Sequence, residues 1–178
     1  MINLSIRFDK NDVRRYTRAL KRILRAVDRE KKELPYRCAV DYVNLLRQNI
    51  LTQKFAGSYR PYNEKYADWK AQYFEAQGYL VMRGLMVNAL TIFRDRGYKT
   101  RWYGGLPPNL PLAPGSSWLY PPGHGKPKSI NMYAWLNEFG GTKAKARPVF
   151  VPTKQEYERE GIPRRIEESQ NIIGRSWQ

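Results

Sequence analysis

The sequence predicts an α+β fold in which N-terminal helices pack on a small antiparallel β-sheet, followed by a C-terminal helix. Three observations support this class: helical periodicity dominates the first half of the chain, two short β-type runs flank a turn at residues 95–97, and a helix-capping pattern precedes the last segment. With 178 residues and 42% hydrophobic content, the chain can bury its own core. We therefore expect a single domain over residues 1–178, with a Pro/Gly-rich insertion at about 104–128.

The N-terminal region predicts a short strand and two helices. Apolar and polar residues alternate over residues 2–8, as in a half-buried strand. From Val13 to Val27 apolar residues recur at three- and four-residue steps, which predicts an amphipathic helix of about 20 residues. Leu34-Pro35 is expected to end it, because proline is well accommodated in a first helical turn, and a second helix follows over residues 35–53.

The middle of the chain predicts a third helix, a hairpin and a long loop. Asn63 can cap a helix over residues 64–77. Asp95-Arg96-Gly97 forms a turn between the runs Leu90–Arg94 and Tyr98–Tyr103, which indicates a β-hairpin. Residues 104–128 hold seven prolines and five glycines, a composition that excludes regular elements. Loops of this length are usually functional or disordered.

The C-terminal region predicts two helices joined by an extended segment. Asn131–Phe139 forms the first helix, and Arg147–Val151 is extended because a residue before proline avoids the helical region. Thr153, followed three residues later by Glu156, forms a capping box for the last helix. We expect Gly161-Ile162-Pro163 to interrupt this helix.

The residue types offer little material for catalysis or metal binding. Cys38 is the only cysteine and His124 the only histidine, which excludes an internal disulfide, a cysteine-based zinc site and a histidine-dependent triad. Neither paired carboxylates nor a phosphate-binding loop appears, so we expect no enzyme activity, no cofactor and no metal. No apolar run approaches membrane-spanning length, and the first residues lack a signal-peptide core. We expect either a cytosolic protein or a component of something that is assembled in the cytosol.

The formal net charge is +16, and the excess lies in the first two thirds of the chain. Such a charge attracts polyanions, nucleic acid above all. The polar side of the first helix carries the candidate contacts to DNA or an acidic partner: Arg14, Arg15, Arg18, Lys21, Arg22 and Arg25. Two interpretations stay open, a solvated basic surface or a row of cations along a nucleic-acid backbone. No sequence-reading motif accompanies them, which favours non-specific contact.

Three motifs, in this order, resemble a known protein family. The stretch "YADWKAQYFEAQGYLVMRGLMVNAL" (66–90) is similar to a region of phage virion-morphogenesis proteins in which a Trp-containing segment precedes a turn and a short helix. The stretch "MYAWLNEFGGT" (132–142) resembles the "YA…EFGT" pattern of tail-completion or neck proteins of tailed bacteriophages, with Gly141 extra. "ARPVF" (146–150) stands where that family has "ARPF", with Val149 inserted.

The resemblance implies a structural, non-enzymatic protein that completes the tail or the head–tail junction. It implies a ring, expected to be hexameric, around a channel whose DNA it contacts non-specifically, next to neck and tail proteins such as a tail terminator or connector. The protein would reside in the virion after assembly in the host cytoplasm. Candidate subunit or neighbour contacts are Trp118, Leu119, Tyr120, Glu138, Phe139, Arg147, Pro148 and Phe150. The alternative is a basic protein that binds DNA non-specifically while free in the cytosol.

Overall fold

The computed structural model describes residues 9–59, 61, 64–73, 85–108, 129–140 and 145–177. These residues are mostly helical with one two-stranded antiparallel sheet, which confirms the α+β class. The elements are α1 (Lys10–Leu51), the 3₁₀ helix η1 (Ala56–Ser58), α2 (Glu64–Tyr73), α3 (Leu85–Ala89), β1 (Thr91–Arg94), β2 (Trp102–Gly105), α4 (Ile130–Phe139), α5 (Phe150–Glu156), the π-helical turn η3 (Tyr157–Gly161) and α6 (Ile162–Arg175). The expected strand at residues 2–8 and most of the Pro/Gly-rich insertion lie outside the described residues.

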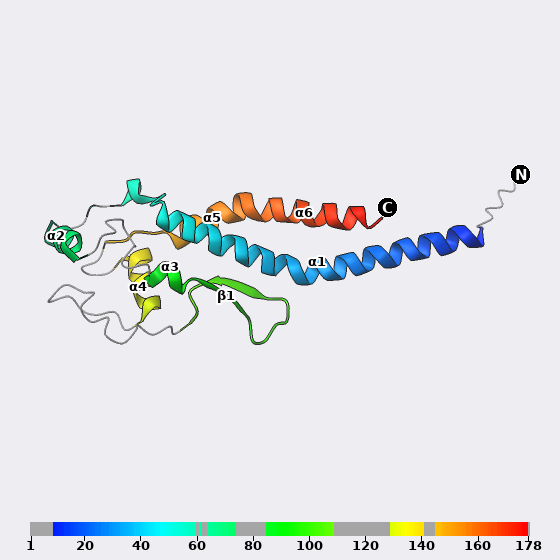
Figure 1. The fold of residues 1–178 in the computed structure, drawn as a ribbon, viewed down its shortest axis with the longest axis horizontal. Helices are drawn as coiled ribbons and strands as arrows, with labels where there is room; N and C mark the ends of the chain where they lie inside the picture. The colour runs from blue at the N-terminus through cyan, green and yellow to red at the C-terminus, as the bar shows by residue number, and fades with distance from the viewer. Residues whose placement is uncertain are drawn as a thin grey trace, which may run out of the picture.

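A single helix, α1, replaces the two helices expected at the N-terminus, so the predicted break at Leu34-Pro35 is wrong. Its 42 residues extend about 63 Å at helical rise and run along most of the elongated molecule (Figure 1). Asp9 caps its start by accepting a hydrogen bond of 2.9 Å from the Asn11 N–H. Pro35 removes one intrahelical hydrogen bond, and α1 bends but does not end (Figure 1). Contacts of Glu30 with Ser169 of α6 and of Tyr36 with Trp102 of β2 hold the turns around Pro35 and keep the helix continuous.

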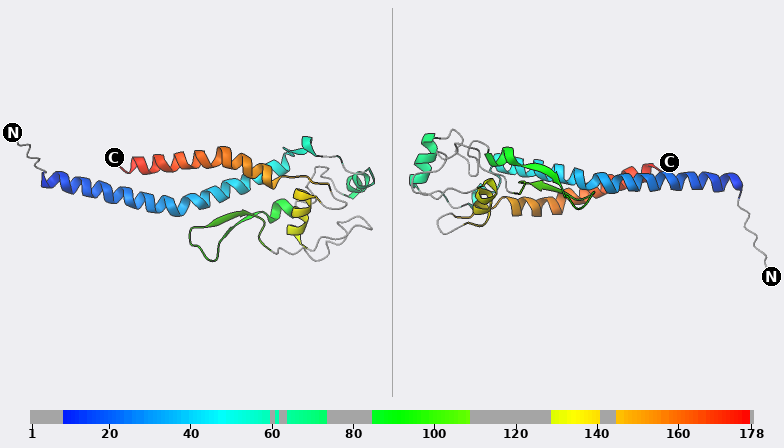
Figure 2. Two further views of the ribbon diagram at one scale, coloured as in Figure 1. Left: turned by 180° about the vertical axis from the view of Figure 1, so that it is seen from behind. Right: turned by 90° about the horizontal axis from the view of Figure 1, so that it is seen from below.

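The C-terminal segment α5–η3–α6 returns along α1, with α6 beside it in Figures 1 and 2. The predicted capping box is wrong, because α5 begins at Phe150 and Thr153 lies buried within it, accepting a 3.1 Å hydrogen bond from Asn49 Nδ2. The predicted interruption at residues 161–163 is also wrong. The π-helical turn carries the chain onward, and Pro163 stands in the first turn of α6, where its missing N–H costs little.

The predicted β-hairpin is confirmed, with a later second strand. β1 pairs with β2 from Thr91–Gly105 to Arg94–Trp102, so the connection spans residues 95–101. Asp95 organises this connection, accepting hydrogen bonds from the Gly97 N–H at 2.8 Å and the Tyr103 hydroxyl at 3.1 Å. The second strand therefore starts at Trp102 and not at Tyr98.

The core gathers around the C-terminal half of α1. Leu46 and Ile50 are buried there against α3 and the segment before α5, and Tyr59 donates a 2.7 Å hydrogen bond to the Pro148 carbonyl. The hairpin packs on the same half, and a Cβ on Gly104 would lie 2.8 Å from the Ala39 carbonyl oxygen. The body of the protein is thus built on one half of a helix whose other half extends away from it (Figure 1).

Candidate interaction surfaces on the projecting helix

The first turns of α1 have few neighbours in the described part of the chain. Every residue from Asp9 to Arg18 is exposed. Figure 1 shows these first turns projecting past the C-terminal end of α6. Helices shorter than 12–15 residues are marginal in water, and this one is held by the turns that continue it into the body. Among the described residues, these first turns therefore leave their whole circumference open to a partner, whereas further along the helix one side is covered and Ala19, Ala26 and Glu30 are buried.

An apolar stripe runs along the projecting N-terminal half of α1 and consists of Val13, Tyr16, Leu20, Leu24 and Val27. Their exposed fractions are 47%, 60%, 54%, 63% and 39%, so the amphipathic pattern read from the sequence is real but its apolar side faces solvent. At 3.6 residues per turn the five side chains fall within about 80° of arc. Contiguous exposed apolar surface of this kind marks a contact site. The sequence pattern indicates the stripe, but it does not indicate that no described part of the chain covers it.

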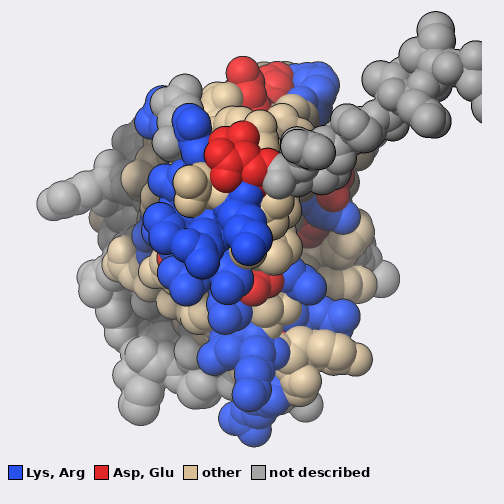
Figure 3. Space-filling model, turned by 90° about the vertical axis from the view of Figure 1, so that its right-hand side faces the viewer, with Lys and Arg blue, Asp and Glu red and all other residues tan. Residues whose placement is uncertain are grey.

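The six predicted basic residues share the other side of the same helix. Arg14, Arg15, Arg18, Lys21, Arg22 and Arg25 are all exposed. Helical geometry places them within about 120° of arc, centred opposite the apolar stripe. Figure 3 looks at the end of the molecule from which α1 projects, and lysine and arginine gather there in a patch. The structure thus brings these residues together as a basic surface that can meet phosphates or carboxylates.

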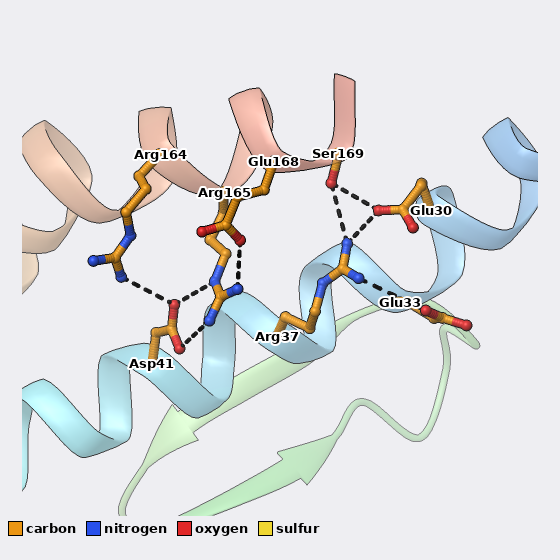
Figure 4. A network of polar contacts seen from close by, with 8 residues as sticks. All are labelled: Glu30, Glu33, Arg37, Asp41, Arg164, Arg165, Glu168 and Ser169. Carbon is orange, nitrogen blue, oxygen red and sulfur yellow. Dashed lines mark hydrogen bonds and ion pairs between the residues drawn. The ribbon is translucent and has the colours of Figure 1, made fainter. Parts of the chain in front are cut away.

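An ion-pair clasp joins the C-terminal half of α1 to α6. Asp41 of α1 accepts two hydrogen bonds from Arg165 of α6, at 2.5 Å from Nε and 2.7 Å from Nη2 (Figure 4). Arg164 lies 3.5 Å from the same carboxylate, and Glu168 accepts a further bond of 2.5 Å from Arg165. The pairing with Arg165 lowers the pKa of Asp41 against the opposing effect of its burial, so the carboxylate is ionised at neutral pH.

A second polar contact lies nearer the projecting half. Glu30 is buried, accepts a 2.8 Å hydrogen bond from the Ser169 hydroxyl and pairs with Arg37 (Figure 4). Arg37 also donates to Ser169 at 3.1 Å. Burial raises the pKa of Glu30, but the bonds from Ser169 and Arg37 outweigh it, and the net pKa is lowered. Ser169 lies more than 130 residues from both Glu30 and Arg37 in the chain, so nothing in the sequence pattern could pair it with them.

Glu138, one of the expected neighbour contacts, has an internal role. It is buried at the end of α4 and accepts three backbone N–H bonds from Val149, Phe150 and Val151, at 2.8, 2.9 and 2.7 Å. These are the N–H groups that the first turn of α5 leaves without helical partners. A carboxylate there also complements the helix dipole. Glu138 therefore fixes the turn into α5 and is not presented to a neighbour.

The other expected contacts are distributed unevenly. Arg147 is buried, Pro148 and Phe150 are partly buried, and Phe150 packs against the core. Phe139 is exposed and lies 5.7 Å, centroid to centroid, from the exposed ring of Trp135. That aromatic pair on α4 is a second apolar surface, of which the sequence analysis selected only one member. Trp118, Leu119 and Tyr120 lie outside the described residues.

The described ranges contain no group of three histidine, cysteine, aspartate or glutamate side chains placed to hold a metal ion. Among the same residues, no helix combines the length and apolar character needed to cross a bilayer. His124 lies outside the described residues, and Cys38 is a half-buried free thiol. Comparison of the chain with protein-family models, with curated proteins and with solved structures finds no match.

Proposed function

We propose that this chain is a structural protein of a tailed-bacteriophage neck, a tail-completion or head–tail junction component that acts by assembly and not by catalysis. In this proposal, copies form a ring, expected to be hexameric, around the DNA channel of the virion. The ring contacts neighbouring neck and tail proteins, and its basic surface faces channel DNA without reading its sequence. The protein is assembled in the host cytoplasm.

One observation carries the proposal: a projecting helix has a basic side and an apolar side, and a folded body anchors it. Such a helix can contact protein with one side and a polyanion with the other at the same time. Ring subunits around DNA need both kinds of surface, because each subunit touches its neighbours and the channel contents. The clasp between Asp41 and Arg165 supports this role by fixing the direction in which the helix leaves the body.

The motifs that resemble neck proteins add a second line of support. In this structure "EFGGT" contributes Glu138 and "ARPVF" contributes the backbone N–H groups of Val149 and Phe150 that it binds. The two motifs therefore form one structural unit, the turn into α5. Their joint occurrence in the sequence thus has a physical reason.

A free basic DNA-binding protein is the second candidate, and the basic surface of α1 favours it. It differs from the first in what a lone subunit does. A free DNA-binding protein binds duplex DNA as a monomer. The logarithm of its binding constant falls linearly with the logarithm of the salt concentration, with a slope of about −0.9 for each phosphate neutralised. A neck subunit holds DNA weakly until a ring multiplies its contacts.

The test is a triple variant, Arg14→Glu, Arg18→Glu and Arg25→Glu, introduced into assembling particles. We expect particles that fail to retain DNA, since the channel surface then repels phosphate. The matched control is Arg96→Glu, Lys99→Glu and Lys145→Glu, three exposed residues off the projecting helix that change the net charge by the same amount. DNA retention with the first triple variant would contradict the placement of α1 at the channel.

Electron cryo-microscopy of the assembled particle checks the location itself. Density for a ring of this chain at the head–tail junction is the expected result. Density elsewhere, or particles complete without the chain, would overturn the neck assignment. Tight, salt-sensitive binding of a 30-base-pair duplex by the isolated monomer would favour the free DNA-binding protein instead.

A further inference from the structure

The apolar stripe of α1 has a symmetric spacing. Its members Val13, Tyr16, Leu20, Leu24 and Val27 are separated by three, four, four and three residues. This order reads the same from either end, with Leu20 at the centre. A surface that is unchanged when its direction is reversed can pair with a copy of itself about a two-fold axis.

We infer that the occupant of the apolar stripe is a second copy of this chain, bound antiparallel with the two-fold axis at Leu20. Leu20 then meets Leu20 of the partner subunit, and Val13 lies opposite Val27 of the partner subunit. Tyr16 lies opposite Leu24 of the partner subunit. Each layer joins one side chain from either edge of the stripe, which is how antiparallel helices interlock. The pairing concerns the free chain in solution and does not rest on the proposed function.

The charges around the stripe agree with this pairing. The basic surface centred on Arg18 and Arg22 lies on the opposite side of α1, so the two copies turn their arginines away from each other. Lys10 and Asp28 are both exposed and lie on the same edge of the stripe, five helical turns apart. Reversal of the helix brings Lys10 close to the level of Asp28 of the partner subunit. The pair therefore gains opposite charges at its ends and buries no cluster of like charges.

The shape of the molecule permits the pairing. With Leu20 at the axis, the two helices overlap over residues 10–30. The core of each copy is built on the rest of α1, and only the last turns of α6, beyond the Glu30–Ser169 contact, lie beside the overlap, on the side of the buried Ala26 and not on the exposed stripe (Figures 1 and 4). The two bodies therefore lie at opposite ends of the helix pair. The overlap is about 30 Å long at helical rise, which is enough for about three turns on each side of Leu20 to interlock.

A lipid surface fits the same stripe less well. Helices that lie in a membrane interface place lysine and arginine at the edges of the apolar side, where the long side chains reach the headgroups. Here one edge carries a single lysine, Lys10, with Thr17 and Asp28, the other edge carries Asp12 and Ala19, and the arginines centre on the far side. This distribution favours a protein partner over a membrane.

The first test measures the mass of the chain by sedimentation equilibrium across a dilution series. Wild type is expected to dissociate from dimer to monomer on dilution. Leu20→Glu places two carboxylates at the axis and should raise the dimer dissociation constant about 100-fold or more. The matched control is Arg18→Glu, which introduces the same side chain two positions away on the basic surface and should leave the dimer intact. Unchanged circular dichroism shows that both variants fold.

The second test fixes direction and register by cysteine cross-linking in a Cys38→Ser background. Leu20→Cys should form a disulfide with itself. Val13→Cys and Val27→Cys should cross-link when two tagged copies are mixed, and neither should do so alone. Self-cross-linking of Val13→Cys would show a parallel pair and overturn the antiparallel assignment.

A wild-type chain that stays monomeric at 100 µM would overturn the inference. Monomers that bind vesicles of 3:1 neutral to anionic phospholipid through Leu20 would assign the stripe to a membrane instead. These outcomes leave the neck proposal standing, because it is tested by ring density and DNA retention. Loss of DNA retention without loss of the dimer would in turn separate the basic surface from the pairing surface.

Discussion

The two halves of α1 follow one amphipathic pattern but differ in the burial of their apolar residues. In the C-terminal half the apolar residues, among them Leu46 and Ile50, are buried in the core. In the N-terminal half Leu20 and Leu24 are more than half exposed. The same helical period thus gives an apolar side that packs against the chain itself in one half and is exposed among the described residues in the other. Periodicity reports that a helix has an apolar side, and tertiary structure decides what covers it.

The largest expected effect comes from comparing two leucine-to-alanine substitutions on this helix. Leu46→Ala removes a side chain with no exposed surface and should lower the free energy of unfolding by about 2–5 kcal/mol through lost burial and a new cavity. Leu24→Ala should change it by less than about 0.5 kcal/mol in a monomeric chain. Urea denaturation at low protein concentration measures both. Equal losses would show that the projecting half is covered by its own chain.

The next effect concerns Glu138 at the turn into α5. Glu138→Ala leaves three N–H groups without their acceptor and should cost about 2–4 kcal/mol. Glu138→Gln keeps one acceptor oxygen and should cost roughly half of that. Thermal unfolding measures the series, with the exposed Glu158→Ala as the control that stays near wild type. An unaffected Glu138→Ala protein would refute the internal role of this carboxylate.

A glycine pair tests how closely the hairpin sits on the buried half of α1. A Cβ at Gly104 would lie 2.8 Å from the Ala39 carbonyl oxygen and from Val43 Cγ2, so Gly104→Ala should cost about 1–3 kcal/mol. Gly57→Ala is the control, since a Cβ there meets nothing within 4 Å. Chemical denaturation of the two variants gives the difference. If both alanines are tolerated equally, β2 does not pack on α1 at this distance.

The smallest effect is the pH dependence of the clasp. The pKa of Asp41 lies below its ordinary value of 3.8, mainly because Arg165 donates hydrogen bonds to the carboxylate. A lowered folded-state pKa contributes stability that is present above pH 3.8 and is lost as the pH falls through the folded value. Asp41→Asn should therefore cost about 1–2 kcal/mol at pH 7 and progressively less below pH 3.8.

Denaturant titrations at pH 7 and pH 3 measure this convergence. Glu167→Gln, an exposed carboxylate on α6, serves as the control and should stay near wild type at both values. A constant difference between wild type and Asp41→Asn across this range would mean that the Asp41 carboxylate does not titrate with the clasp.

The sequence by itself determined the local features of this protein. Periodicity and turn residues predicted the amphipathic character of residues 13–27, the α4 helix, the hairpin around Asp95 and the grouping of the six basic residues. These features depend on neighbours within a few positions in the chain. A single sequence carries that information, because side-chain spacing and backbone preference act over one or two helical turns.

Only the tertiary structure decided where helices continue and what their charged residues do. Pro35 would end an isolated helix, but the contacts of Glu30 with α6 and of Tyr36 with β2, one on each side of it, offset the lost hydrogen bond. Thr153 is a good cap by sequence and lies buried instead, because Glu138 already satisfies the N–H groups at that end. Asp41 accepts hydrogen bonds from Arg165, which lies 124 residues away in the chain. Such pairs depend on packing between distant segments. The free energy of that packing outweighs local helix-propensity costs of a few kcal/mol.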